Sequence, residues 1–402
     1  MDLIISKQKC SACGACMQTC AKDAIQLKPD EYGFLYPIID DTRCVDCGAC
    51  KLHCHYHHPQ ERNSVISTYA SMIKDESIKR SSSGGVFVKL AESFIQNGGV
   101  VIGCAMNHSD DCVYSEHIVV SNVSDLHRLQ GSKYVQSRMG DIYKKTKTLL
   151  KKEVRVLFSG TPCQIAGLKA YLCRDYLNLY LVDVICHGVP NEIMFNGYLK
   201  KLSEKIKGKI YDYKFRDKEL DWGINMRAFA ISEKGEKIEK VIPPEDSSFF
   251  RLFLSSHITR ESCIGCCYAD ANRLGDITLG DYWGIHYFHP EESKTKFIDN
   301  QKGVSAVLVN SPKGEEMYAC IKKSINSVDS KFTFVQEHNS QVVRPVTAPF
   351  DRDKALESFK VKGYEGIEEF YYQKIGLKKY FYKIKNFIPR RYRVYLKKLI
   401  GK

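Results

Sequence analysis

Eight cysteines near the start of the chain are arranged as two copies of one pattern. The segment CSACGACMQTC is followed thirty-four residues later by CVDCGACKLHC, and each copy has the spacing C-x2-C-x2-C-x3-C. Bacterial two-cluster ferredoxins have this spacing, and in them three thiolates of a run bind one [4Fe–4S] cluster while the fourth binds the other. The pattern predicts two clusters. Their ligand sets are Cys10, Cys13, Cys16 and Cys54 for the first, and Cys44, Cys47, Cys50 and Cys20 for the second.

Zinc is the other common use of clustered cysteines. Zinc sites usually combine two cysteine pairs across a longer loop, whereas here four cysteines fall within eleven residues, twice. The spacing therefore favours iron–sulfur clusters. Ferredoxins usually have proline at the positions that Ala21 and His55 occupy here. This difference affects the expected reduction potential of the clusters more than whether clusters are bound. The histidine-rich segment HCHYHHPQERNS is predicted to be a solvated linker.

A second group of cysteines lies in the body of the chain. Cys263 and Cys266 form one C-x2-C pair in SCIGCCYA, which supplies only two of four ligands. Cys163 stands at a strand-to-helix turn in LFSGTPCQIAGL, and Cys186 ends the strand of DVICHG. Parallel strands end at one sheet edge, where α/β folds bind ligands. We therefore predict a third [4Fe–4S] cluster on these four residues.

Two other interpretations of Cys163 stay open at this point. It is also interpretable as an inert thiol packed in the core, because free cysteine is among the most buried residue types. Alternatively it is a reactive thiol, which would need a base, and His187 in the segment ICHG is the candidate.

The elements that position these residues follow from the hydrophobic pattern. VRVLFSG, TPCQIAGLKAYL and LYLVDVICHG predict a strand, a helix and a parallel strand, while MRAFAISEKGEKIEKVI predicts a hairpin turning at Lys234 and Gly235. The predicted fold is an α+β ferredoxin-like two-cluster module followed by an α/β body with a mixed, partly parallel sheet. The predicted divisions are 1–60 for the module, 61–150 and 151–350 for the two parts of the body, and 351–402 for a basic tail.

Two predicted helices begin after small polar residues. Ser81 to Gly85 precede a helix starting at Val86, and Gly160 and Thr161 precede the next candidate. Free amides and the helix dipole suit a phosphate at such positions, although simple N-capping explains each of them equally well. The loop QGSKYVQS adds Lys133 and Tyr134, side chains able to pair with phosphate and to cover a ring.

Composition sets the class of protein. The chain has 402 residues, 44% of them hydrophobic, and its 17 cysteines occur without a secretory signal or a long apolar run. We therefore expect a cytoplasmic protein that uses its thiols for metal or redox chemistry and not for disulfides.

The net charge of +13 is concentrated at the carboxyl end. Residues 374–402 contain eleven Lys or Arg and no Asp or Glu, and the remaining 373 residues carry 49 basic and 47 acidic side chains. This distribution argues against a nucleic-acid partner. The segment is amphipathic, and we expect it either to dock on the body or on a partner subunit, or to lie on the inner face of the membrane.

Seven segments in a fixed order carry a family resemblance. These are SSSGG, GSKYVQS, FSGTPCQIAGL, DVICHGVP, FRDK, SCIGCCYA and GDITLGDYWG. Together, behind the two-cluster module, they resemble the beta-subunit family of coenzyme F-420-reducing hydrogenases and dehydrogenases from about residue 5 to residue 345.

The resemblance implies a flavin-binding body and supports the third cluster. Members of this family bind FAD and iron–sulfur clusters. The candidate flavin contacts that it implies are Ser82, Ser83, Gly84, Gly85, Lys133, Tyr134, Gln136, Ser137 and Thr161. Clusters transfer single electrons, so a two-electron reaction needs a converter such as flavin. We expect electrons from a ferredoxin-like carrier to reach a small organic substrate, with His187 or Asp281 as candidate proton donors. The alternative is an electron-transfer subunit that serves a partner enzyme.

Overall fold

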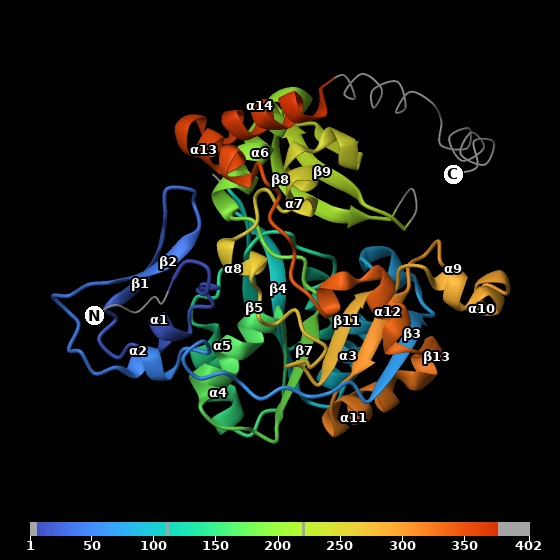
Figure 1. Ribbon diagram of the computed structural model, residues 1–402. Coiled ribbons are helices and arrows are strands. Elements are labelled where there is room, and N and C mark those ends of the chain that lie inside the picture. Colours follow the sequence, from blue (N-terminus) through green and yellow to red (C-terminus); the bar gives the residue numbers. More distant parts are fainter. Residues whose placement is uncertain (1–5, 110–111, 219–221, 377–402) are drawn as a thin grey trace.

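The computed structural model describes residues 6–109, 112–218 and 222–376 (Figure 1). The amino-terminal module forms a small lobe at one side of the molecule. In it each cysteine run begins a short helix, and a two-stranded antiparallel ribbon lies between the runs. Its elements are α1 (Ala15–Thr19), β1 (Ile25–Pro29), β2 (Leu35–Ile39) and α2 (Ala49–Leu52).

The body is built on an eight-stranded mixed sheet with the order β13-β3-β12-β11-β7-β6-β4-β5. The neighbours β11, β7, β6 and β4 are parallel, and the outer pairs are antiparallel. The carboxyl ends of four strands therefore meet at one edge. The strands are β3 (Ser67–Ile73), β4 (Val100–His108), β5 (Val113–Val120), β6 (Val156–Gly160), β7 (Leu179–Val184), β11 (Ile277–Asp281), β12 (Ser305–Val309) and β13 (Ile325–Ser330).

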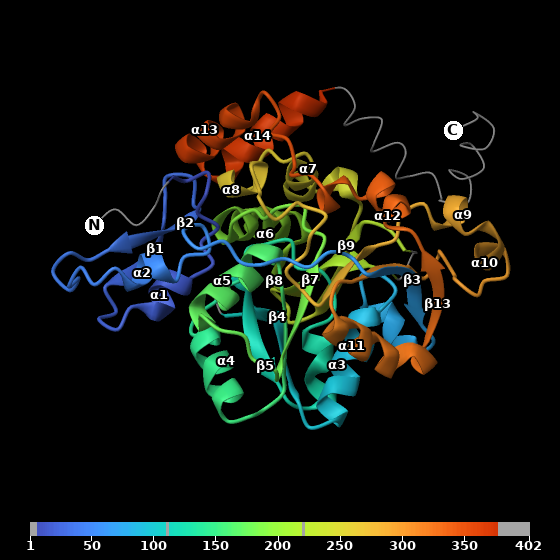
Figure 2. The same cartoon turned by 60° about the horizontal axis from the view of Figure 1, so that its bottom comes forward.

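Helices cover both faces of this sheet (Figure 2). Leu157 on β6 faces the core that contains α3 (Val86–Gln96) and α11 (Pro312–Ile321). Its neighbour Phe158 faces the core that contains α4 (Ile142–Lys151) and α5 (Pro162–Leu172). Successive strand residues point to opposite faces, so the two cores lie on opposite sides of the sheet.

A second, three-stranded antiparallel sheet has the order β10-β9-β8 and its own apolar core. Four helices pack on this core, including the two carboxyl-terminal ones (Figure 1). The elements are α6 (Glu192–Ile206), β8 (Gly208–Asp217), β9 (Asn225–Ser232), β10 (Lys237–Ile242), α7 (Ser248–Leu254), α13 (Arg352–Lys362) and α14 (Tyr364–Ile375). Short helices connect the remaining segments: α8 (Glu261–Ile264), α9 (Ile285–Phe288), α10 (Pro290–Lys294) and α12 (Phe332–His338).

The predicted fold class is confirmed for the ferredoxin-like module and for the mixed sheet. The predicted β-α-β unit is β6-α5-β7 with parallel pairing, and the predicted hairpin is β9-β10. The expected tail differs from the structure, because residues 352–375 form α13 and α14, whose apolar side chains are buried in the second core. The amphipathic segment beyond residue 376 lies outside the described residues.

The division at residue 151 runs through the large sheet, since β3, β4 and β5 precede it and the other five strands follow it. The two halves of the body therefore share one sheet. In the part of the chain that the structure describes, no helix combines the length and the apolar character needed to cross a membrane.

Candidate redox centres and ligand cavity

The first predicted cluster site is a small cavity of about 50 Å³ inside the module. All four predicted ligands, Cys10, Cys13, Cys16 and Cys54, line it. Backbone amides of Ala12, Ala15 and Met17 donate hydrogen bonds to the sulfur atoms of the first three. Burial, followed by the neighbouring thiols, raises the pKa of Cys16 to about 12.

The second predicted ligand set lies next to the first. Cys44, Cys47 and Cys50 are close enough for their charges to interact, and Cys20 packs with Cys50 against Ile25. The Ala24 amide donates to the Cys20 Sγ at 3.3 Å. Cys47 is exposed, so this site faces solvent.

The third predicted site is a separate cavity of about 50 Å³ at the carboxyl edge of the large sheet. The first turn of α5 places Cys163 there, the segment after β7 places Cys186, and α8 with the residues after it places Cys263 and Cys266. The structure thus brings together the four cysteines that the sequence grouped. Burial, then the neighbouring thiols, raises the pKa of Cys263 to about 12 and that of Cys266 to about 11.

These donor sets fit [4Fe–4S] clusters. Four thiols that share one cavity repel one another as thiolates, and a cationic iron core between them removes that cost. Within the described ranges no three His, Cys, Asp or Glu side chains converge closely enough for one metal ion. A cubane needs a wider arrangement, because each thiolate binds a different iron. Amides that donate to sulfur, such as Gly188 N–H to Cys186 Sγ at 3.4 Å, also suit a cluster.

The reactive-thiol interpretation of Cys163 finds no support in the contacts. Its Sγ lies 3.2 Å from Thr161 Oγ1, and burial raises its pKa. His187 instead donates from Nε2 to the Leu254 carbonyl at 2.9 Å. The candidate base is thus bonded elsewhere, and the thiol is held in its protonated form unless a metal binds it.

Two glycines allow the backbone to approach these cysteines. A Cβ atom at Gly167, in the middle of α5, would lie 2.8 Å from the Cys13 Sγ, so the body packs directly against the first cluster site. Gly188 has φ +94°, and a Cβ there would lie 3.0 Å from the Cys263 Cβ. Larger residues at either position would push a ligand out of place.

A cavity of about 520 Å³ opens between the module, the sheet edge and the second sheet. Its wall includes Cys13 of the first cluster site and Cys163 and Cys186 of the third. Ser11 lines all three cavities. Sites predicted separately from the sequence therefore share walls, and this adjacency is what electron transfer between them requires.

Eight of the nine candidate flavin contacts line this cavity. They are Ser82, Ser83, Gly85, Lys133, Tyr134, Gln136, Ser137 and Thr161. Gly84 does not line it, because it packs on β3, where an added Cβ would lie 2.2 Å from the Ser71 carbonyl oxygen. The need for glycine at this position is thus explained by packing.

Several of these side chains are already bonded within the protein. Ser82 Oγ accepts from the Ser132 amide at 2.6 Å, and Lys133 Nζ donates to the Leu129 and Gln130 carbonyls at 3.0 and 2.8 Å. Burial lowers the pKa of Lys133 to about 8. The loops are therefore held in place by internal bonds, and their backbone groups and one buried amine form the cavity wall.

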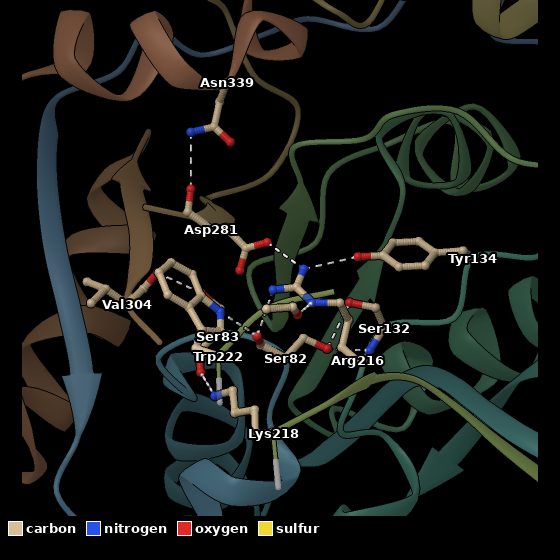
Figure 3. Close-up of polar contacts among 11 residues, drawn as sticks. Ser82, Ser83, Ser132, Tyr134, Arg216, Lys218, Trp222, Asp281, Val304 and Asn339 are labelled. Carbon is tan, nitrogen blue, oxygen red and sulfur yellow. Dashed lines mark hydrogen bonds and ion pairs between the residues drawn. The ribbon is translucent and has the colours of Figure 1, made fainter. Parts of the chain in front are cut away.

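Sequence reasoning missed a buried ion pair at the same wall (Figure 3). Arg216 Nη1 donates to Asp281 Oδ2 at 2.7 Å and to Tyr134 Oη at 3.2 Å, while Nη2 donates to the Ser82 carbonyl at 3.3 Å. One guanidinium thus joins β8, β11, the loop that contains Ser82 and the loop that contains Tyr134. The segment FRDK contained the only signal for it, since nothing in the spacing links residues 216 and 281.

Lys218 and Trp222 hold the same loop from its other side (Figure 3). Lys218 Nζ donates to the Ser83 carbonyl, and Trp222 Nε1 donates to the Ser82 carbonyl at 3.0 Å. Trp222 stacks on Trp283 at 4.6 Å, and the Arg216 guanidinium lies 5.5 Å from the Trp283 ring centroid. Burial, then the nearby Arg216, lowers the pKa of Lys218 to about 7.

The prediction of a solvated histidine-rich linker is wrong for two residues, because His53 Nδ1 lies 3.0 Å from the Ala170 carbonyl oxygen and His55 is buried. His55 is 3% exposed, and its ring nitrogens lie 3.1 Å from Ser11 Oγ and 2.6 Å from Tyr268 Oη. It therefore joins the module to the body, next to Cys54. A polar stretch with proline is typical of a linker, and only the tertiary contact with Tyr268 buries this ring.

His117 is a buried histidine on the wall of the large cavity, and it predicts that stability depends on pH. Burial lowers the pKa of His117 from 6.5 to about 4. Between these pH values the unfolded chain takes up the proton first, so stability falls as the pH falls, by about 2 kcal/mol from pH 6.5 to pH 5. We expect the His117→Gln variant not to show this decrease in stability as the pH falls.

Thermal unfolding at both pH values checks this. The exposed variant His127→Gln should behave like the wild type. An equal pH response in His117→Gln and the wild type would contradict the assignment.

The fold and the three cysteine sites define an iron–sulfur protein in which a ferredoxin-type module is joined to an α/β domain. Residues 9–57 match the family described as 4Fe-4S dicluster domain. Residues 154–330 match the family described as the C terminus of the coenzyme F420 hydrogenase/dehydrogenase beta subunit. The resemblance to the beta-subunit family that was seen in the sequence is confirmed by these two matches.

Two similar proteins illustrate the relationship. The chain is 22% identical over 335 residues to one of the subunits of the F(420)H(2) dehydrogenase of Methanosarcina mazei, covering 78% of this chain and 88% of that protein. A chain in the solved F420-reducing [NiFe] hydrogenase complex of Methanosarcina barkeri, studied by xenon derivatization, is 14% identical, with a TM-score of 0.43. That match covers 77% of this chain and 91% of the other.

Proposed function

We propose that the protein is an iron–sulfur flavoprotein oxidoreductase. It passes electrons between a ferredoxin-type one-electron carrier and a two-electron organic substrate through three [4Fe–4S] clusters and FAD. The observation that supports this best is the shared wall: Cys13, Cys163 and Cys186 line the cavity that also contains the candidate flavin contacts. The dicluster match and the relationship to oxidoreductase subunits support the cluster part independently.

The residues of the large cavity fit FAD. Its volume of about 520 Å³ is that of a cofactor site. The first four N–H groups of a helix have no partner within it, so the start of α3 after Gly85 offers donors to a pyrophosphate. Lys133 adds a buried amine, and Tyr134, Phe250 and Phe253 add an apolar wall for a ring. Bound FAD would supply the conversion between one-electron and two-electron transfer.

The chain's own residues have separate roles in this proposal. The cluster cysteines hold iron, with Cys47 exposed where a carrier can approach. Arg216 orders the loops around the phosphates through Ser82 and Tyr134. His187 and Asp281, both on the cavity wall, are the candidates for holding a proton near the substrate.

Arg216→Met should lower both stability and FAD retention. It leaves the Asp281 carboxylate buried without its partner, which costs about 3–5 kcal/mol. We expect the variant to bind FAD at least about tenfold more weakly, equivalent to 1.4 kcal/mol. Adding Asp281→Asn to Arg216→Met removes the unpaired carboxylate and should restore stability while FAD binding stays weak. Equal FAD binding in the wild type and the double variant would contradict the role of Arg216.

The second candidate function is an electron-transfer subunit without its own substrate. The similar protein of Methanosarcina mazei is itself one of the subunits of a dehydrogenase, which favours this function. Anaerobic turnover distinguishes the candidates. A lone chain that oxidises reduced ferredoxin while reducing a small molecule supports the first function, and activity only after addition of a partner subunit supports the second.

For the cell we propose a protein of the cytoplasm, with residues 374–402 docked on a partner subunit or on the inner face of the membrane. Their eleven basic residues support contact with an acidic surface. Flotation with anionic liposomes, with and without these residues, tests the membrane contact.

A further inference from the structure

Arg260 differs from every other buried arginine in the described residues. Five arginines are buried there, and four of them form ion pairs. Those four pairs are Arg216 with Asp281, Arg227 with Asp217, Arg273 with Asp183, and Arg352 with Glu261. Arg260 is 1% exposed, and no carboxylate of the described ranges is among its contacts.

The contacts of Arg260 are neutral acceptors. Nε donates to the Cys10 carbonyl at 2.9 Å, Nη1 to Gln136 Oε1 at 3.2 Å, and Nη2 to the Leu35 carbonyl. The guanidinium also lies 4.4 Å from the centroid of the Tyr36 ring. Each guanidinium nitrogen donates one of these bonds, but a full positive charge remains in the interior, which is costly without a counter-charge.

The position of this charge suggests what balances it. Arg260 donates to the backbone of Cys10, a ligand of the first cluster site. It also lines the cavity of the third site, together with Cys163, Cys186, Cys263 and Cys266. Its charge acts on the sulfur atoms of Cys10, Cys163 and Cys263. The guanidinium therefore lies between two sets of four thiolates.

We propose that Arg260 is the shared counter-charge of the first and third clusters and that it raises the reduction potentials of both. The inference rests on the proposed function for the third cluster, and on the dicluster module alone for the first. Each reduction adds one electron to a cluster and no proton, so the reduced form is more negative by one charge. A fixed cation in a medium of low dielectric constant stabilises that form more than the oxidised one.

The raised reduction potentials give electron transfer a preferred direction. The second site is exposed at Cys47, so water and dissolved ions screen the charges around it. Arg260 therefore makes transfer from the second cluster toward the interior favourable. Arg260 places a fixed positive charge near the clusters and does not itself transfer electrons.

Redox titration followed by electron paramagnetic resonance tests the proposal on the anaerobic, full-length protein. Dithionite is the reductant and mediator dyes carry the electrons. Arg260→Gln removes the charge and keeps a hydrogen-bonding group, while Arg260→Lys keeps the charge. We expect Arg260→Gln to bind the electron at least tenfold more weakly, a fall of 59 mV for a one-electron couple, and Arg260→Lys to shift by less than half of that. The control Lys9→Gln removes an exposed cation beside the first cavity and should change little.

Each result decides the question. Unchanged potentials in Arg260→Gln, or an equal fall in Arg260→Lys, would overturn the proposal. If Arg260→Gln fails to retain iron, a loaded Arg260→Lys still supports the need for charge, and loss of iron from both would show that the fork geometry matters instead. Iron and spin counts of the wild type are measured first. A missing third cluster would count against the proposed function, while the potential of the first cluster would still test Arg260.

Discussion

We expect Cys263→Ser to lower the iron content of the anaerobically purified chain from about twelve atoms to about eight, because the proposed third [4Fe–4S] cluster would be lost. Cys263 is buried in the cavity with Cys163, Cys186 and Cys266, and an alcohol in its place is a poor ligand for iron. The remaining iron stays in the module. We also expect reduction of the bound flavin by dithionite to slow, because Cys163 and Cys186 lie on the flavin cavity wall.

The neighbouring Cys267 provides a matched control. It is exposed and does not line the third cavity, so Cys267→Ser should keep about twelve iron atoms. Iron and sulfide analysis of the three proteins decides the outcome. Equal iron content in Cys263→Ser and the wild type would show that no third cluster is bound at this site.

Gly167→Val should disrupt the junction between the module and the body. A side chain there meets the Cys13 Sγ at 2.8 Å and the Tyr143 hydroxyl at 2.8 Å, so either α5 or the first cluster ligand must move. Overpacking of this kind costs about 1–3 kcal/mol. We expect the first cluster to be lost, with iron falling to about eight atoms, and electron entry to the cavity to stop.

Gly197→Val separates the cluster effect from simple destabilisation. Gly197 lies on α6, and an added Cβ would be 2.5 Å from the Tyr364 Cβ, with only Tyr364 atoms among its three nearest contacts. Its thermal midpoint should fall as in Gly167→Val while its iron content stays complete. Full iron and normal reduction in Gly167→Val would show that the close approach has no functional role.

The features that depend on spacing along the chain were predictable from the sequence. The cysteine runs grouped the four residues that line the first cavity, and the strand-helix-strand pattern placed Cys163 and Cys186 at one edge, where the structure has them with Cys263 and Cys266. The small residues before α3 also line the cavity, except Gly84. In each case the residue types and their spacing along the chain were sufficient for the prediction.

What escaped prediction depends on residues brought together from distant segments. Arg216 and Asp281 are 65 positions apart, and their pairing follows from the second sheet folding over the edge of the first. His55 is buried only because Tyr268 lies beside it, and the helices at 352–375 are recognisable only by the core that they cover. The hydrophobic pattern within each of these segments does not indicate which distant residues the segment contacts.

Cofactor analysis of the chain, purified without oxygen, shows whether it binds three [4Fe–4S] clusters and FAD. Iron, sulfide and zinc are measured per chain, and the flavin is released and identified by mass spectrometry. We expect about twelve iron atoms with matching sulfide and about one FAD per chain. Zinc in place of iron, or FAD below about 0.2 per chain in fully iron-loaded protein, would contradict it.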